Sequence, residues 1–154
     1  DRTYDLAPAL AQPAIGRGIA GGDVDNDGDP DLLVTRNDGP PLLLRNDAGG
    51  GRHWLGLRLL DKKGKADALG ATARLLRPEF PAGAVQVRRV ATDGSYASAK
   101  DPRILLALPA GATAADVALR WPDGSEEEVR GLAAGRYHAL VQVQTQATGS
   151  PAGP

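Results

Sequence analysis

A cluster of aspartates is the most chemically informative part of this sequence. The segment DVDNDGDPDLLV spans residues 23–34 and places an aspartate at its positions 1, 3, 5, 7 and 9. Gly28 stands at position 6, where a sharp turn favours a residue without a Cβ. Carboxylates this close repel one another unless something neutralises them. The ligand order matches a calcium loop, so the spacing predicts a Ca²⁺ site formed by Asp23, Asp25, Asp27, the backbone carbonyl of Asp29, and Asp31.

The residues after this loop differ from those of an EF-hand. Val34 occupies position 12, where an EF-hand carries a bidentate glutamate, and a strand-like run follows in place of a helix. The loop is therefore expected to join two strands. The alternative is a solvated Asp/Gly-rich turn that binds no metal. Magnesium is a weaker competitor, because it prefers few protein ligands and several waters.

Few other residues suggest a reactive or binding site. Tyr96, in the loop-like segment DGSYAS, is the best candidate for an aromatic that contacts a ligand, whereas Trp54 and Trp121 are expected to pack in the core. His53 and His138 lack recognisable partners for acid–base or zinc chemistry. Nucleophile-elbow, P-loop and zinc-protease motifs do not occur, so we expect no enzymatic activity.

Composition narrows the classes of partner. The net charge is −1 among 154 residues, and the cations are scattered, which disfavours nucleic acid and anionic membranes as partners. No apolar stretch is long enough to cross a bilayer, so no membrane insertion is expected. The chain has no cysteine and no methionine and begins with Asp1. We expect a processed product whose signal peptide is not in this chain.

Short apolar or alternating runs, separated by Gly, Asp, Asn and Pro, indicate strands throughout. No helical period runs long enough to compete. The expected class is all-β, with a calcium-loop β-hairpin attached to a β-sandwich or jelly-roll-like domain. The predicted strands cover residues 17–22, 31–36, 41–46, 53–60, 70–77, 85–92, 103–109, 115–121, 125–131 and 137–143.

Two parts of the chain resemble known families. GRGIAGGDVDNDGDPDLLVTRNDGPPLLLRND (16–47) resembles an FG-GAP or VCBS-type repeat, the calcium-binding blade of integrin-α-like propellers. WLGLRLLDKKGKADALGATARLL, VRRVATDGSYASAKDPRILLALP and ADVALRWPDGSEEEV resemble the ASPIC/UnbV domain, as in cartilage acidic protein-like secreted proteins. The resemblance implies a non-enzymatic, calcium-binding structural or adhesive module, located outside the cell or at its surface.

The expected organisation has four parts. An extended N-terminal segment (1–15) precedes the FG-GAP-like hairpin (16–47), and the Gly-rich run NDAGGGR separates the hairpin from the ASPIC/UnbV-like sandwich (53–143). A tail rich in Gly, Pro, Ser and Thr (144–154) follows.

A single propeller-type repeat cannot bury its apolar face alone, and its hairpin is expected to leave open strand edges. We therefore expect the chain to associate with itself, as a homo-oligomer or filament, or with other surface proteins. An N-terminal segment that adds a strand to the next subunit would propagate such an assembly. The alternative function is a carbohydrate-binding module that uses Tyr96.

Overall fold

The computed structural model describes residues 13–47, 53–76 and 85–143, and these residues form ten strands and no helix. The all-β prediction is confirmed, and each predicted strand is present with small differences at its ends. Most of the predicted N-terminal segment, most of the Gly-rich boundary and the whole tail lie outside the described residues. The strands are β1 (Gly16–Gly22), β2 (Asp31–Arg36), β3 (Leu42–Leu44), β4 (Trp54–Leu60), β5 (Thr72–Leu76), β6 (Val87–Arg89), β7 (Ile104–Ala107), β8 (Ala114–Arg120), β9 (Glu126–Ala133) and β10 (Tyr137–Val141).

The first three strands form a separate antiparallel sheet in the order β1-β2-β3. We call this the hairpin sheet. Its strands pair in register, with Leu33 opposite Leu43 and Val34 opposite Ile19. Residues directly opposite one another point to the same side of a sheet, and neighbours along a strand point to opposite sides. Leu33 and Leu43 therefore share one face, and Val34 and Ile19 share the other, so both faces carry apolar side chains.

The remaining strands form two sheets, with orders β10-β4-β7 and β6-β5-β8-β9. We call these two sheets together the module. Most neighbouring strands are antiparallel, but β10 runs parallel to β4, and Tyr137 lies opposite Gly56. Strand alternation indicates which side chains face inward and contains no information about this pairing.

The core of the module lies between its two sheets. Leu55, Leu57 and Leu59 of β4 are almost completely buried, as are Val117 and Leu119 of β8. These side chains join one cluster with residues of β5, β7 and β9. Side chains spaced two apart on a strand face the same way, and these apolar residues of both strands follow this spacing, so they all point into the core.

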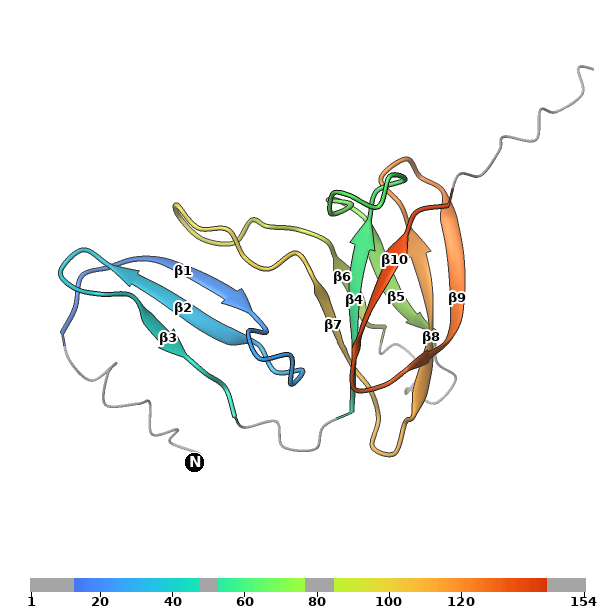
Figure 1. The fold of residues 1–154 in the computed structure, drawn as a ribbon, viewed down its shortest axis with the longest axis horizontal. Helices are drawn as coiled ribbons and strands as arrows, with labels where there is room; N and C mark the ends of the chain where they lie inside the picture. The colour runs from blue at the N-terminus through green and yellow to red at the C-terminus, as the bar shows by residue number, and fades with distance from the viewer. Residues whose placement is uncertain (1–12, 48–52, 77–84, 144–154) are drawn as a thin grey trace, which may run out of the picture.

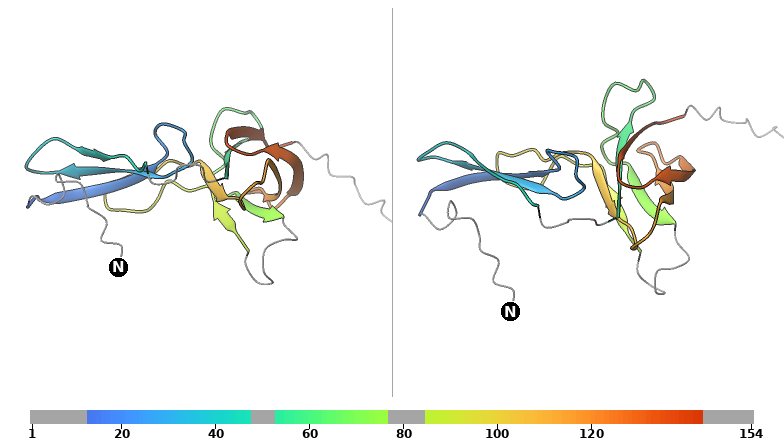
Figure 2. Two further views of the ribbon diagram at one scale, coloured as in Figure 1. Left: turned by 90° about the horizontal axis from the view of Figure 1, so that it is seen from below. Right: turned by 60° about the horizontal axis from the view of Figure 1, so that its bottom comes forward.

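The hairpin sheet lies to one side of the module, and the β1–β2 loop is at the end nearest to it (Figure 1). The long connection between β6 and β7 leaves the module and runs along β1, as the other views also show (Figure 2). The backbone N–H of Asp101 donates to the carbonyl of Gly21 at 3.0 Å. A Cβ on Gly18 would lie 2.4 Å from the Ser98 hydroxyl. β1 and β3 are the edge strands of the hairpin sheet, as expected, and the β6–β7 connection covers part of the outer edge of β1.

None of the described segments forms a helix with the length and apolar character needed to cross a membrane.

Candidate metal centre

The aspartate loop connects β1 to β2, as the sequence predicted. Gly22 and Asp31 are the last pair of the β1–β2 ladder, so the chain between them closes a compact loop. Two of its residues adopt positive φ, Asn26 at 61° and Gly28 at 92°. Asparagine is among the few residues that tolerate this region, and glycine reaches it without a steric penalty. The predicted sharp turn at Gly28 is present.

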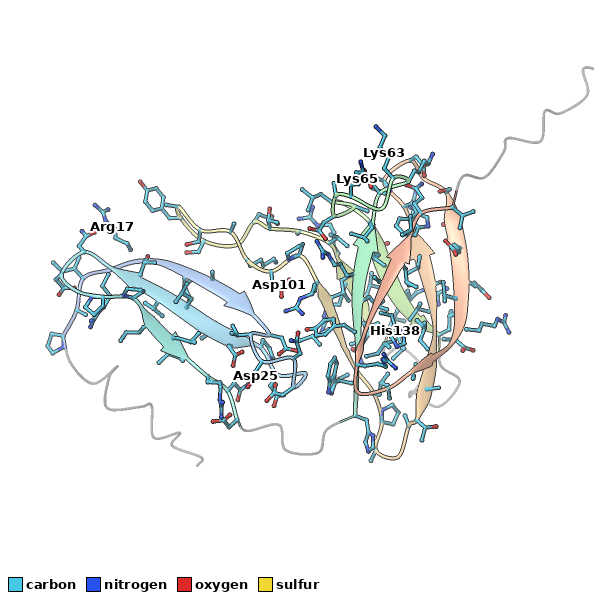
Figure 3. The ribbon with its side chains drawn as sticks, in the orientation of Figure 1. Arg17, Asp25, Lys63, Lys65, Asp101 and His138 are labelled. Atoms are coloured by element: carbon cyan, nitrogen blue, oxygen red, sulfur yellow. The ribbon has the colours of Figure 1, made fainter. Side chains whose placement is uncertain are left out.

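Three carboxylates of the loop converge. Asp23, Asp25 and Asp27 each offer one carboxylate oxygen, and these oxygens lie within 4.8 Å of one another. Asp23 is buried, at 2 % exposure, whereas Asp25 and Asp27 are exposed. Figure 3 shows Asp25 in the loop at the end of the hairpin sheet nearest the module. The arrangement is a half-buried set of hard oxygen donors, of the kind that suits a hard divalent cation.

The side chains of Asp29 and Asp31 do not belong to this cluster of three. The carboxylate of Asp31 is 1 % exposed and accepts backbone N–H groups from Val24 and Asn46, each at 2.8 Å. It therefore ties the start of the loop to the segment that follows β3. Asp29 is also buried, and its N–H donates to Asp27 Oδ1 at 2.9 Å. Both aspartates hold the shape of the loop.

The negative charge of the cluster is only partly compensated by neighbouring arginines. Partial desolvation and the neighbouring carboxylate of Asp27 raise the pKa of Asp25. Arg45 Nε lies 3.7 Å from Asp25 but only 2.6 Å from Asp47, so its charge is directed mainly to Asp47. A cation among the three carboxylates would relieve this repulsion.

Tyr137 and Arg103 of the module donate hydrogen bonds to the loop, and neither contact could be inferred from the sequence. The hydroxyl of Tyr137, on β10, donates to Asp23 Oδ2 at 2.8 Å. Arg103, just before β7, donates through Nη2 to the carbonyl of Asp23 at 2.6 Å. Tyr137 occupies an ordinary strand position, and Arg103 was notable only within the family motif around DPR. Residues separated by 114 positions leave no local pattern that could reveal such a contact.

Arg103 is itself held in place. Its Nε donates to Asp101 Oδ2 at 2.7 Å, and its backbone N–H donates to Asp101 Oδ1 at 2.9 Å. Its guanidinium lies 4.2 Å from the centre of the Tyr137 ring, in cation–π geometry. The hydrogen bond that Arg103 donates to Asp101 raises the pKa of Arg103, while burial raises the pKa of Tyr137, so both side chains keep their protons.

Trp54 completes this contact region. Its ring meets Tyr137 edge to face, with centroids 5.2 Å apart. The indole is buried, as expected. It packs beneath the aspartate loop, where a Cβ on Gly28 would lie 2.3 Å from it, and it does not belong to the central core cluster. Trp121, by contrast, belongs to the central core, as predicted.

The other candidate residues lie away from the metal cluster. Tyr96 is 75 % exposed in the β6–β7 connection. His138 Nε2 lies 2.9 Å from the carbonyl of Ala133, and His53 is half-buried just before β4. None of the three offers a ligand to the three-carboxylate cluster, although His53 lines a cavity with Gly28, Asp29 and Trp54 beside the aspartate loop.

Comparison with known proteins identifies one family. The family model described as ASPIC and UnbV matches residues 61–147, more than half of the chain, and this match includes Asp101, Arg103 and Tyr137. No curated protein and no solved structure matches the chain. The chain belongs to the ASPIC and UnbV family.

Proposed function

We propose that this protein is a non-enzymatic, calcium-binding structural or adhesive β module that works outside the cell. The observation that carries the proposal is the convergence of Asp23, Asp25 and Asp27 within 4.8 Å at the point where the hairpin sheet meets the module. The resemblance of residues 16–47 to an FG-GAP repeat supports the choice of calcium. So does the hairpin sheet, whose two apolar faces suit a propeller blade.

The donor set favours calcium over magnesium. Ca²⁺ accepts six to eight oxygen ligands in flexible geometry, whereas Mg²⁺ requires a near-ideal octahedron and retains its waters. Three carboxylates converging from one loop suit the larger ion. Extracellular modules of this kind bind calcium with Kd of roughly 10⁻⁴ to 10⁻³ M, which millimolar calcium would occupy.

The decisive experiment is thermal unfolding of the full chain with a chelator and then with calcium. Calcium at about 100 times Kd stabilises a protein by about 2.7 kcal/mol, so we expect the melting temperature to rise by several degrees. Asp25→Asn should abolish this rise. Asp38→Asn is the matched control, because Asp38 is an exposed aspartate of the same sheet that lies outside the cluster and away from Arg45. An unchanged melting temperature of the natural chain at that calcium concentration, roughly 10–100 mM for a Kd in this range, would refute the proposal.

The apolar faces of the hairpin sheet favour association with a further copy or with another surface protein. Leu33 is 41 % exposed and Leu43 is 53 % exposed, on one face, and Ile19 is exposed on the other. Adjacent apolar side chains left in water on both faces of a small sheet are typical of an interaction surface. We propose self-association through these faces, which would extend to filaments if the contact is head to tail.

A glycan-binding role is the second candidate, and the exposure of Tyr96 favours it. An exposed aromatic ring on a loop can stack on a sugar. Binding to a glycan array that Tyr96→Phe retains and Tyr96→Ala loses would establish it, and an array without hits would exclude it.

A further inference from the structure

We propose that Tyr137 and Arg103, two residues of the ASPIC/UnbV domain, are positioning residues for the cation held by the aspartate loop. Calcium affinity and the docking of the loop on the module would then be one coupled equilibrium. This inference rests on the calcium site proposed above, and it concerns residues far from that loop in sequence.

The first argument comes from the hydrogen bonds of the Asp23 carboxylate. Oδ2 accepts two of them, from the N–H of Gly28 at 3.0 Å and from the Tyr137 hydroxyl at 2.8 Å. Oδ1 accepts one, from the N–H of Asp27 at 3.1 Å. Each carboxylate oxygen has about two lone-pair sites, so Oδ2 is filled and Oδ1 retains one. Tyr137 thus determines which oxygen of Asp23 is available to a cation.

The second argument concerns the backbone of the loop. Arg103 donates to the carbonyl of Asp23 at 2.6 Å and to the side-chain oxygen of Asn26 at 2.5 Å. Asn26 has φ of 61° and lies between the two exposed aspartates of the cluster. The Arg103 guanidinium also lies against the Tyr137 ring. This one side chain therefore holds both the loop backbone and the tyrosine that orients Asp23.

The third argument is the close packing of the Tyr137 and Trp54 rings against two glycines. A Cβ on Gly56 would lie 2.3 Å from the Tyr137 ring, and a Cβ on Gly28 would lie 2.3 Å from the Trp54 ring. Glycine at both positions leaves room for the tyrosine ring against β4 and for the tryptophan ring against the loop. The loop and the module therefore pack in close contact, which a side chain larger than hydrogen at either glycine would prevent.

These contacts couple calcium binding to the docking of the aspartate loop on the module. If the docked loop binds calcium more tightly than the undocked loop, calcium must favour docking by the same factor. Groups that orient metal ligands in this way typically change metal affinity roughly 10- to 100-fold when they are removed.

The test is calcium titration by isothermal calorimetry on the full chain. Tyr137→Phe removes only the hydroxyl and should weaken calcium binding roughly 10-fold. Tyr96→Phe is the matched control, since it removes the hydroxyl of an exposed tyrosine outside the contact, and it should leave the affinity unchanged. Equal affinity of Tyr137→Phe and the natural chain would overturn the inference. A natural chain that binds no calcium would instead overturn the proposed function.

A second measurement separates positioning from a general loss of stability. The melting temperature is recorded for each variant in chelator and in calcium, and the difference between the two is compared. A positioning role predicts that this difference shrinks in Tyr137→Phe, whereas a merely structural role lowers both temperatures equally. If Tyr137→Phe does not fold, Arg103→Lys is used instead, because lysine keeps the charge but cannot bridge Asp23, Asn26 and Asp101 together. An unchanged difference in the folded variant would refute the inference.

Discussion

The hydroxyl of Tyr137 donates a hydrogen bond to the carboxylate of Asp23 at 2.8 Å, across 114 positions of the chain. This bond joins β10, the last described strand of the ASPIC/UnbV domain, to the first carboxylate of the aspartate loop. It makes the loop part of the domain's surface, although the two are distant in sequence.

Gly28→Ala should destabilise the protein strongly. Its φ of 92° is unfavourable for alanine, and the new Cβ would lie 2.3 Å from Trp54. Backbone strain costs roughly 1–2 kcal/mol, and overpacking adds roughly 1–3 kcal/mol. Gly111→Ala is the control, because φ is 81° there and the space around it is open. Chemical denaturation should give a clearly larger loss for Gly28→Ala, and equal losses would contradict the close contact with Trp54.

Leu57→Ala should create a cavity between the two sheets of the module. Leu57 is fully buried, and such truncations cost roughly 2–5 kcal/mol. Leu69→Ala, at an exposed leucine of the same module, should change the free energy of unfolding by no more than about 0.5 kcal/mol. Urea denaturation monitored by circular dichroism measures both. A small effect at Leu57 would argue against the described core.

Asp123 should make stability depend on acid pH. A hydrogen bond from Lys62, followed by those from Ser125, lowers the pKa of Asp123 in the folded state. A lowered pKa stabilises the fold above the unfolded value near 3.8, and this contribution is lost as pH falls below it. The natural chain should therefore have a higher melting temperature than Asp123→Asn at pH 7. The difference between the two melting temperatures should narrow below about pH 4.

The control for this pH dependence is Asp38→Asn, which alters an exposed aspartate with one long hydrogen bond, 3.3 Å from the N–H of Ile15. Its melting temperature should follow that of the natural chain at every pH. A gap for Asp123→Asn that stays constant from pH 7 to pH 3 would show that the Asp123 charge contributes nothing.

Leu43→Asp should disrupt self-association if the hairpin sheet forms the contact. Light scattering on the natural chain in calcium should give a mass above that of a monomer, and the charged variant should give a lower mass. Leu69→Asp is the control, since Leu69 is equally exposed, at 53 %, but belongs to the module. Removal of residues 1–15 should also dissolve any filament. Monomers at all concentrations of the natural chain would exclude self-association.

Much of the fold could be predicted from local pattern. Residues 115–121 were predicted as a strand with Trp121 in the core, and the period of two places Val117, Leu119 and Trp121 on the buried side together. The turn at Gly28 followed from the spacing of the aspartates. Both features depend on neighbours in sequence.

What could not be predicted depends on distant pairs. The parallel pairing of β10 with β4 and the path of the β6–β7 connection along β1 arise from tertiary packing. The side-chain position of Asp31, outside the three-carboxylate cluster, depends on the N–H of Asn46, which follows β3. No spacing rule within the loop contains that information.

The parallel pair β4–β10 has a mechanical consequence. Tension applied to the chain on either side of the module would pull on the start of β4 and on the end of β10. In a parallel pair these points lie at opposite ends of the ladder, which runs from Tyr137 opposite Gly56 to Val141 opposite Leu60. The load would therefore act in shear on all the interstrand hydrogen bonds at once, and they could not break one after another. The parallel pairing of β4 with β10 thus makes the module resistant to tension along the chain.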